Sequence, residues 1–116
     1  MIALSPHMRI LLAASPVDFR KGIDGLAAVC RKVLDTDPFA GYLFVFVNKK
    51  KISIKILVYD GQGFWLCQKR LSKGHFKFWP AANDSKASTL EAHQLQALIW
   101  SKNPSTKTSL WKKIPN

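Results

Sequence analysis

The chain has 116 residues, of which 47% are apolar, and its 18 Lys and Arg outnumber its 7 Asp and Glu to give a net charge of +11. This length and composition fit one globular domain with a single core and exclude an intrinsically disordered chain. A charge of this sign and size predicts a negatively charged partner, with nucleic acid first and an acidic membrane surface or an acidic protein as alternatives, unless the basic surface serves only solubility.

The N-terminal segment predicts neither secretion nor membrane insertion. Its apolar run, Ile10–Ala14, is shorter than the core of a signal peptide, and no segment of the chain approaches membrane-spanning length. Cys30 and Cys67 are isolated thiols without metal-ligand spacing, which favours buried side chains in a reducing compartment. We therefore expect a cytoplasmic protein.

A short strand over Arg9–Ala14 and a helix ending near Leu34 are the first predicted elements. Ser15 as N-cap, with a proline and an acid after it, favours an early helix start. Gly22 and Gly25 weaken this prediction, because each costs about 1 kcal/mol inside a helix. Either the helix starts later, near Asp24, or something packs tightly against the glycines. The expected buried face holds Ile23, Leu26, Ala27, Cys30, Val33 and Leu34.

The segment Tyr42–Leu71 predicts a three-stranded antiparallel meander, because three runs rich in β-branched and aromatic residues are separated by two turns. The turns are Asn48–Lys51 and Asp60–Gly63. In the second, an Asp-Gly pair favours a tight turn in which both central residues have positive φ. The middle strand has two faces, since side chains alternate. The face expected in the core holds Ile52, Ile54, Ile56 and Val58.

The remainder predicts a further strand, a loop and a second helix. The strand is expected over His75–Trp79 and the loop over residues 81–87. Ser88–Glu91 forms a capping-box pattern before a helix that ends near Lys102. The predicted fold is α+β: an antiparallel sheet of four or five strands in the order β-α-β-β-β-(β)-α, with one helix packed on a face and a C-terminal helix. The expected organisation is a single domain over residues 1–102 and a basic tail over 103–116 that is loosely held or docks on the domain or a partner.

No catalytic or metal-binding constellation is found in the sequence. Enzymes that cut DNA use clustered carboxylates that hold metal ions, or paired histidines with a tyrosine, and the three histidines here are isolated. Most acids have structural explanations: Asp18 and Glu91 at helix starts, Asp37 before a proline and Asp60 in a turn. No Gly-rich loop precedes a helix. We predict no enzymatic activity, no cofactor and no metal.

The basic half of the chain supplies the candidate nucleic-acid contacts. Residues 1–48 carry five basic and four acidic side chains, whereas residues 49–116 carry thirteen and three. The turn lysines are either phosphate contacts or a solvated loop tip. Arg20 and Lys21 are either contacts or partners of Asp18 and Asp24 in internal salt bridges. The full candidate set is Lys49, Lys50, Lys51, Lys55, Lys69, Arg70, Arg20 and Lys21.

Aromatic side chains admit two interpretations as well. Phe44 and Phe46 are either stacking platforms for bases beside Lys55 or core residues. The core interpretation is favoured, because a small domain needs its large apolar side chains inside. The pair Trp79-Pro80 is more typical of a packed strand end than of a ligand contact.

Several short motifs stand in order and with similar gaps from about Met8 to about Trp100. The main ones are Pro16–Ala27, Asp37–Pro38, Leu43–Phe46, Ile54–Leu57, Asp60–Gly61, Lys69–Leu71 and Trp79–Pro80. Together they resemble one family: the accessory protein TnpB, the second-reading-frame product of bacterial insertion sequences of family sixty-six. The resemblance implies a non-catalytic protein encoded beside the transposase and needed for transposition. We expect it to bind nucleic acid, transposon DNA first, through the basic half. The alternative is an interaction module that binds the transposase without contacting DNA.

Overall fold

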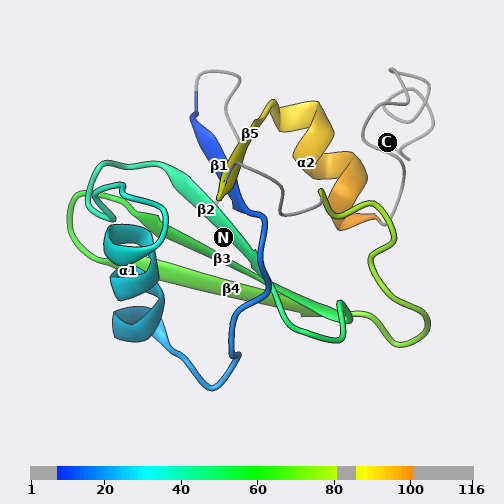
Figure 1. Cartoon of the computed structure of the whole chain (residues 1–116). Helices are drawn as coiled ribbons and strands as arrows, with labels where there is room; N and C mark the ends of the chain where they lie inside the picture. Colours follow the sequence, from blue (N-terminus) through cyan, green and yellow to red (C-terminus); the bar gives the residue numbers. More distant parts are fainter. Residues whose placement is uncertain (1–7, 81–85, 101–116) are drawn as a thin grey trace.

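A computed structural model describes residues 8–80 and 86–100. They form a five-stranded sheet and two helices, so the α+β prediction is confirmed (Figure 1). The strands lie in the order β4-β3-β2-β1-β5. The elements are β1 (Ile10–Ala13), α1 (Ile23–Lys32), β2 (Leu43–Val47), β3 (Ser53–Tyr59), β4 (Phe64–Arg70), β5 (Ala87–Leu90) and α2 (Ala92–Ile99).

Strands β2, β3 and β4 form the predicted antiparallel meander. The turn between β3 and β4 differs in detail from the expectation. Asp60 N donates to Gly63 O at 3.0 Å, and of the two residues between them Gly61 has a φ of +96°. Asp60 has no positive φ; instead its Oδ1 accepts from the N–H groups of Gln62 and Gly63, at 2.8 and 2.9 Å. The positive φ at Gly61 is a conformation that glycine adopts without steric strain.

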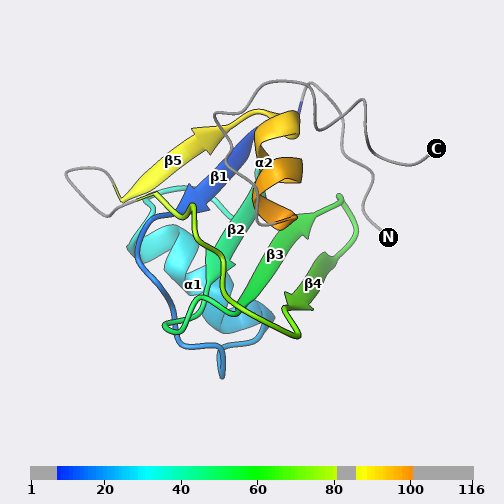
Figure 2. The ribbon, with the colours of Figure 1, turned by 90° about the vertical axis from the view of Figure 1, so that its right-hand side faces the viewer.

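The sheet is mixed, and this corrects the expectation of a purely antiparallel one. β1 pairs in parallel with β2, with Ile10 opposite Leu43. The connection between them contains α1, which carries the chain across one face of the sheet and returns it in the same direction. The figures show α1 on one face and α2 on the other (Figures 1 and 2).

Helix α1 starts at Ile23 with Gly22 as its N-cap, so the start at Ser15 was wrong and the later start is correct. Tight packing against a glycine is also present, because a Cβ at Gly25 would lie 2.9 Å from the Cβ of Lys21. The side chains that α1 buries are Leu26, Ala27 and Cys30. Ile23 and Val33, both expected on the buried face, are 36% and 43% exposed.

Three predictions for residues 75–91 were wrong. His75–Trp79 is not a strand; it is a loop that inserts side chains into the core, and Trp79 Nε1 donates to Ala13 O at 2.9 Å. The fifth strand is β5, which pairs antiparallel with β1 in a stretch expected to be loop and helix start. The capping box lies later, between Glu91 and Gln94. Short strands are set by the neighbour they pair with, which local patterns do not reveal. Lys102 and the tail lie outside the described residues.

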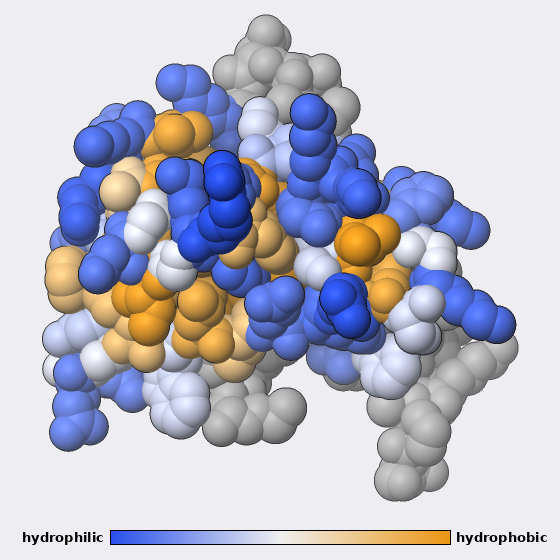
Figure 3. All heavy atoms as spheres, turned by 90° about the horizontal axis from the view of Figure 1, so that it is seen from below, coloured by the Kyte–Doolittle hydropathy of each residue, from blue (hydrophilic) through white to orange (hydrophobic). Residues whose placement is uncertain are grey.

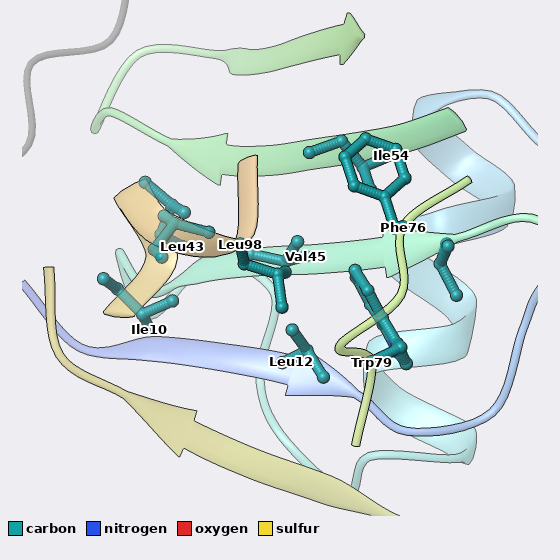
Figure 4. Close-up of a cluster of buried hydrophobic side chains, with 10 residues drawn as sticks. Ile10, Leu12, Leu43, Val45, Ile54, Phe76, Trp79 and Leu98 are labelled. Carbon is teal, nitrogen blue, oxygen red and sulfur yellow. The ribbon is translucent and has the colours of Figure 1, made fainter. Parts of the chain in front are cut away.

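Both faces of the sheet are buried. On the α2 side, Phe76 and Trp79 from the loop join strand and helix side chains, among them Leu12, Val45 and Leu98 (Figure 4). On the α1 side, the fully buried Phe44 and Phe46 pack with helix residues. These two phenylalanines are therefore core residues and not base-stacking platforms. This is the interpretation that the sequence favoured. Both faces of β3 are buried as well: Ile54 and Val58 on one, Ser53, Lys55 and Leu57 on the other.

Candidate nucleic-acid interface

Three segments meet at one end of the sheet. They are the segment Ser15–Gly22 before α1, the β2–β3 loop Asn48–Ile52, and the chain that leaves β4 after Arg70. Backbone hydrogen bonds join them: Val17 N donates to Val47 O at 2.9 Å and Leu71 N donates to Ile52 O at 2.8 Å. We call this the basic end and define it by Arg20, Lys21, Lys49, Lys50, Lys51 and Arg70.

The β2–β3 loop holds its lysines on a fixed backbone. The side-chain oxygen of Asn48 accepts from Ile52 N at 3.0 Å and from Ser53 N at 3.1 Å. Lys51 N donates to Asn48 O at 3.0 Å, and Lys51 has a φ of +58°. Lys49 and Lys50 stand at the tip and are exposed. Their side chains can therefore reach a ligand while the loop backbone keeps its shape.

Lys55, another predicted contact, is not accessible as Lys49 and Lys50 are. It is 7% exposed, and its Nζ donates to Phe19 O at 2.9 Å and to Lys21 O at 3.0 Å. The same ammonium lies 4.9 Å from the centre of the Phe19 ring. Lys55 thus ties the Ser15–Gly22 segment to the sheet. Because this segment is irregular, the Lys55 ammonium supplies hydrogen-bond donors to carbonyls that have no partner in a helix or sheet.

Arg20 is exposed and forms an ion pair within its own segment. Its Nη2 and Nε donate to Asp18 Oδ2 at 2.7 and 3.0 Å, and its backbone N donates to Asp18 Oδ1 at 2.9 Å. These hydrogen bonds and the charge of Arg20 lower the pKa of Asp18 to about 2. The internal salt bridge predicted as one alternative exists, but it links neighbours on the surface and does not join α1 to the sheet. With 91% of the Arg20 side chain exposed, the guanidinium can still meet a phosphate.

Lys69 and Arg70 point to opposite faces of β4 and have different surroundings. Lys69 Nζ donates to Ile99 O at 2.9 Å and lies 4.7 Å from the centre of the Trp100 ring. A cation at the last carbonyls of α2 stabilises the C-terminus of that helix. Arg70 is exposed and lies opposite Ser53. Of the two, Arg70 alone adds to the basic end.

Two further lysines belong beside the basic end and were missed in the sequence. Phe76 N donates to Lys51 O at 2.7 Å, which brings the loop after β4 against the β2–β3 loop. This loop carries Lys73 and Lys77, both exposed. Neither lysine is among the contacts predicted from the sequence, although thirteen of the eighteen Lys and Arg residues lie in residues 49–116.

An open hollow of about 820 Å³ lies between the first two segments. Its walls combine apolar side chains with cations, and Asp18 is the one acid among them. The lining residues are Pro16, Val17, Asp18, Phe19, Arg20, Asn48, Lys49 and Lys50. Figure 3 views the molecule from the side on which Ser15–Gly22 lies in Figure 1 and shows hydrophilic side chains projecting around apolar areas.

The described residues contain no group of three or more His, Cys, Asp or Glu side chains that could hold a metal ion. Burial raises the pKa of the Cys30 thiol to about 12, which makes it a poor nucleophile. No helix within residues 8–80 and 86–100 has the length and apolar character to cross a membrane.

Comparison with known proteins decides the family. Residues 8–108 match the family described as "IS66 Orf2 like protein". The chain belongs to this family. This IS66 Orf2 like protein is therefore an accessory protein of an insertion sequence, and the resemblance found in the sequence is confirmed. The family is not a known catalytic one.

Two relatives come from Sinorhizobium fredii (strain NBRC 101917 / NGR234). "Uncharacterized protein y4jC" is 41% identical over 80 residues, which cover 69% of this chain and 68% of the relative. "Uncharacterized protein y4hO" is 34% identical over 99 residues, which cover 85% and 84%. No solved structure matches this chain.

Proposed function

We propose that this accessory protein acts without catalysis by binding nucleic acid, with transposon DNA as the first target, through the basic end. The observation that carries the proposal is the convergence of three separate segments that bring exposed cations to one end of the sheet. Lys49 and Lys50 come from a loop, Arg20 from the segment before α1, and Arg70 from the end of β4. Such a role implies a cytoplasmic location.

The charge arrangement suits phosphates more than a single small anion. The cations are distributed over neighbouring segments, and Asp18 is the only acid that lines the hollow between the first two. Phosphate contacts of this kind bind in a sequence-independent way, and their affinity comes largely from the release of counterions. Sequence preference, where transposition requires it, would then come from the transposase.

A salt titration tests this function. Fluorescence anisotropy with a labelled duplex from the element end, repeated over a range of salt concentrations, gives the slope of log affinity against log salt. With four or so phosphates neutralised, the expected slope is roughly −3 to −4. Absence of binding to both the duplex and its separated strands at low salt, or an affinity that does not change with salt, would contradict the proposal.

A second candidate function is binding of the transposase through the opposite end of the sheet. There Phe39 contacts Tyr59 and Phe64 with ring centres 4.8 and 5.1 Å apart. Phe39 and Trp65 are 52% and 45% exposed. We call Phe39, Tyr59, Phe64 and Trp65 the aromatic end. Exposed aromatic clusters are typical of protein interfaces.

A pull-down with the transposase encoded by the same element tests the second candidate, with and without element-end DNA. Capture without DNA, lost in a Phe39→Ala, Trp65→Ala double variant, supports direct contact through the aromatic end. Capture that requires DNA assigns the association to the nucleic acid and contradicts the second candidate.

A further inference from the structure

The hollow at the basic end combines apolar walls with a cationic rim. Pro16, Val17 and Phe19 supply apolar surface, while Arg20 and the β2–β3 loop lysines supply charge. Its volume of about 820 Å³ lies in the range of small-ligand sites. A ligand that matches this combination has a flat, weakly polar group joined to anionic groups.

The wall formed by Ser15–Gly22 is fixed before any ligand binds. Val17 N donates to Val47 O, and the Lys55 ammonium holds the carbonyls of Phe19 and Lys21. This irregular segment is therefore bonded to β2 and β3 at three points. Binding against a fixed wall costs less conformational entropy than binding that must order a loop.

Phe19 is placed to stack on a ligand. Lys55 is almost fully buried, so the ammonium over the Phe19 ring lies on the protein side. The ring is half-buried and lines the hollow. Stacking of a base on an aromatic ring is tolerant of base identity, because every base has a π-face.

Asn48 adds a hydrogen-bond donor to the same hollow. Its Oδ1 is occupied by the N–H groups of Ile52 and Ser53. Its Nδ2 carries the two remaining N–H donors of the amide, and Asn48 lines the hollow. A base carbonyl or a phosphate oxygen accepts such a bond.

We infer, resting on the proposed function, that this hollow takes an unpaired nucleobase stacked on Phe19, with the flanking phosphates on Arg20, Lys49 and Lys50. In a duplex the bases stay stacked inside the helix and only phosphates reach the rim. The protein therefore prefers an unpaired strand to a duplex of the same length. DNA and RNA strands share this chemistry.

The decisive comparison is between an oligothymidylate and an abasic DNA strand, which differ only in their bases. Anisotropy of the full chain is measured at one low salt concentration with an oligothymidylate, an oligouridylate, an abasic DNA strand of the same length, and a duplex. We expect the base-bearing strands to bind roughly fivefold or more tightly than the abasic strand, which carries the same phosphates. The tighter of the oligothymidylate and the oligouridylate shows which of these two strands the site favours.

Variants then assign the effect to Phe19. Phe19→Ala is expected to bring the ratio of base-bearing to abasic affinity close to one, while Phe19→Tyr keeps it. Phe39→Ala, which removes an exposed ring at the aromatic end, is the matched control and leaves the ratio unchanged. If Phe19→Ala fails to fold, equal binding of base-bearing and abasic strands by the wild-type protein would still overturn the inference.

The outcomes separate the two claims. Equal affinity of the wild-type protein for base-bearing and abasic strands overturns the inference about the hollow and leaves nucleic-acid binding in place. A base-dependent affinity that survives in Phe19→Ala also overturns it. Absence of binding to every strand at low salt overturns the proposed function together with the inference.

Discussion

The two ends of the sheet differ in what they expose. At the basic end the β2–β3 loop, the segment before α1 and the end of β4 present cations. At the aromatic end the β3–β4 turn and the loop after α1 bring together Phe39, Tyr59 and Phe64. β3 runs between the two ends (Figure 1). The same strands thus separate a surface suited to phosphates from a surface suited to protein.

Lys49 and Lys55 show what decides whether a cation is available. Lys49 lies at a loop tip and is exposed, whereas Lys55, six positions later, lies in β3 under the Ser15–Gly22 segment. A lysine in a strand whose two faces are covered must find acceptors inside the protein, because an unpaired buried ammonium is costly. The number of lysines in the chain therefore overstates the number that can contact a ligand.

Replacement of Lys55 tests the contrast between the buried and the exposed lysine, and it is expected to have the largest effect on stability of the variants considered. Lys55→Met keeps the apolar stem but leaves Phe19 O and Lys21 O without their donor, which is expected to cost roughly 2–4 kcal/mol. Urea unfolding measures the loss. Lys49→Met is the matched control and should unfold like the wild type. Normal stability of Lys55→Met together with lost nucleic-acid binding would show that Lys55 contacts the ligand directly.

Gly61→Val tests the turn that forms the aromatic end. With a φ of +96° at this position, a β-branched side chain is strained and the variant should lose about 1–3 kcal/mol. Valine at Gly63, in the same turn but without a positive φ, is the control and should lose less. Equal losses at the two positions in thermal unfolding would contradict the proposed role of the turn conformation.

Low pH should destabilise the same turn, because it protonates the carboxylate of Asp60. Hydrogen bonds from Gln62 N, Gly63 N and Trp65 Nε1 lower the pKa of this exposed carboxylate. A lowered folded-state pKa means that its stabilising effect is present above the ordinary value of 3.8 and is lost as pH falls below it. Asp60→Asn should change the free energy of unfolding little at neutral pH. Between about pH 6 and about pH 3 the variant should lose less stability than the wild type. Equal losses by variant and wild type in urea unfolding would show that Asp60 does not contribute to the acid sensitivity.

Asp18→Asn should change binding while leaving stability nearly unchanged. The Arg20–Asp18 pair is exposed on the surface, and such pairs contribute little to folding. Without the carboxylate, Arg20 is free to meet a phosphate, so we expect affinity for nucleic acid to rise roughly two- to fivefold. Because the pKa of Asp18 is about 2, this gain should not vary with pH near neutrality. Unchanged or weaker binding by the variant would argue against a phosphate beside Arg20.

The sequence predicted those parts of the fold that depend on local patterns. The meander, the helix before it and the α+β class follow from alternation, turn residues and apolar spacing. β5 and the buried loop with Phe76 and Trp79 could not be predicted, because their conformation depends on β1 and on the core of the sheet. For the same reason the hollow was missed: Phe19 and Asn48 come from distant segments whose meeting depends on Lys55 and on the backbone of β2.

The most direct test of the basic end compares two charge reversals of equal size. Lys49→Glu with Lys50→Glu acts at the basic end, and Arg31→Glu with Lys32→Glu acts on exposed cations in the last turn of α1. Both variants should keep their stability within about 0.5 kcal/mol, since they lie on the surface.

Affinity for a duplex probe, measured across salt, then gives the answer. We predict that the Lys49 and Lys50 variant loses affinity by about tenfold or more and that its salt slope on duplex becomes shallower by about 1.8, as expected for two lost phosphate contacts. The Arg31 and Lys32 variant should stay within about twofold of the wild type. Equal losses in the two variants would show that binding follows net charge alone and would contradict the assignment of the interface to the basic end.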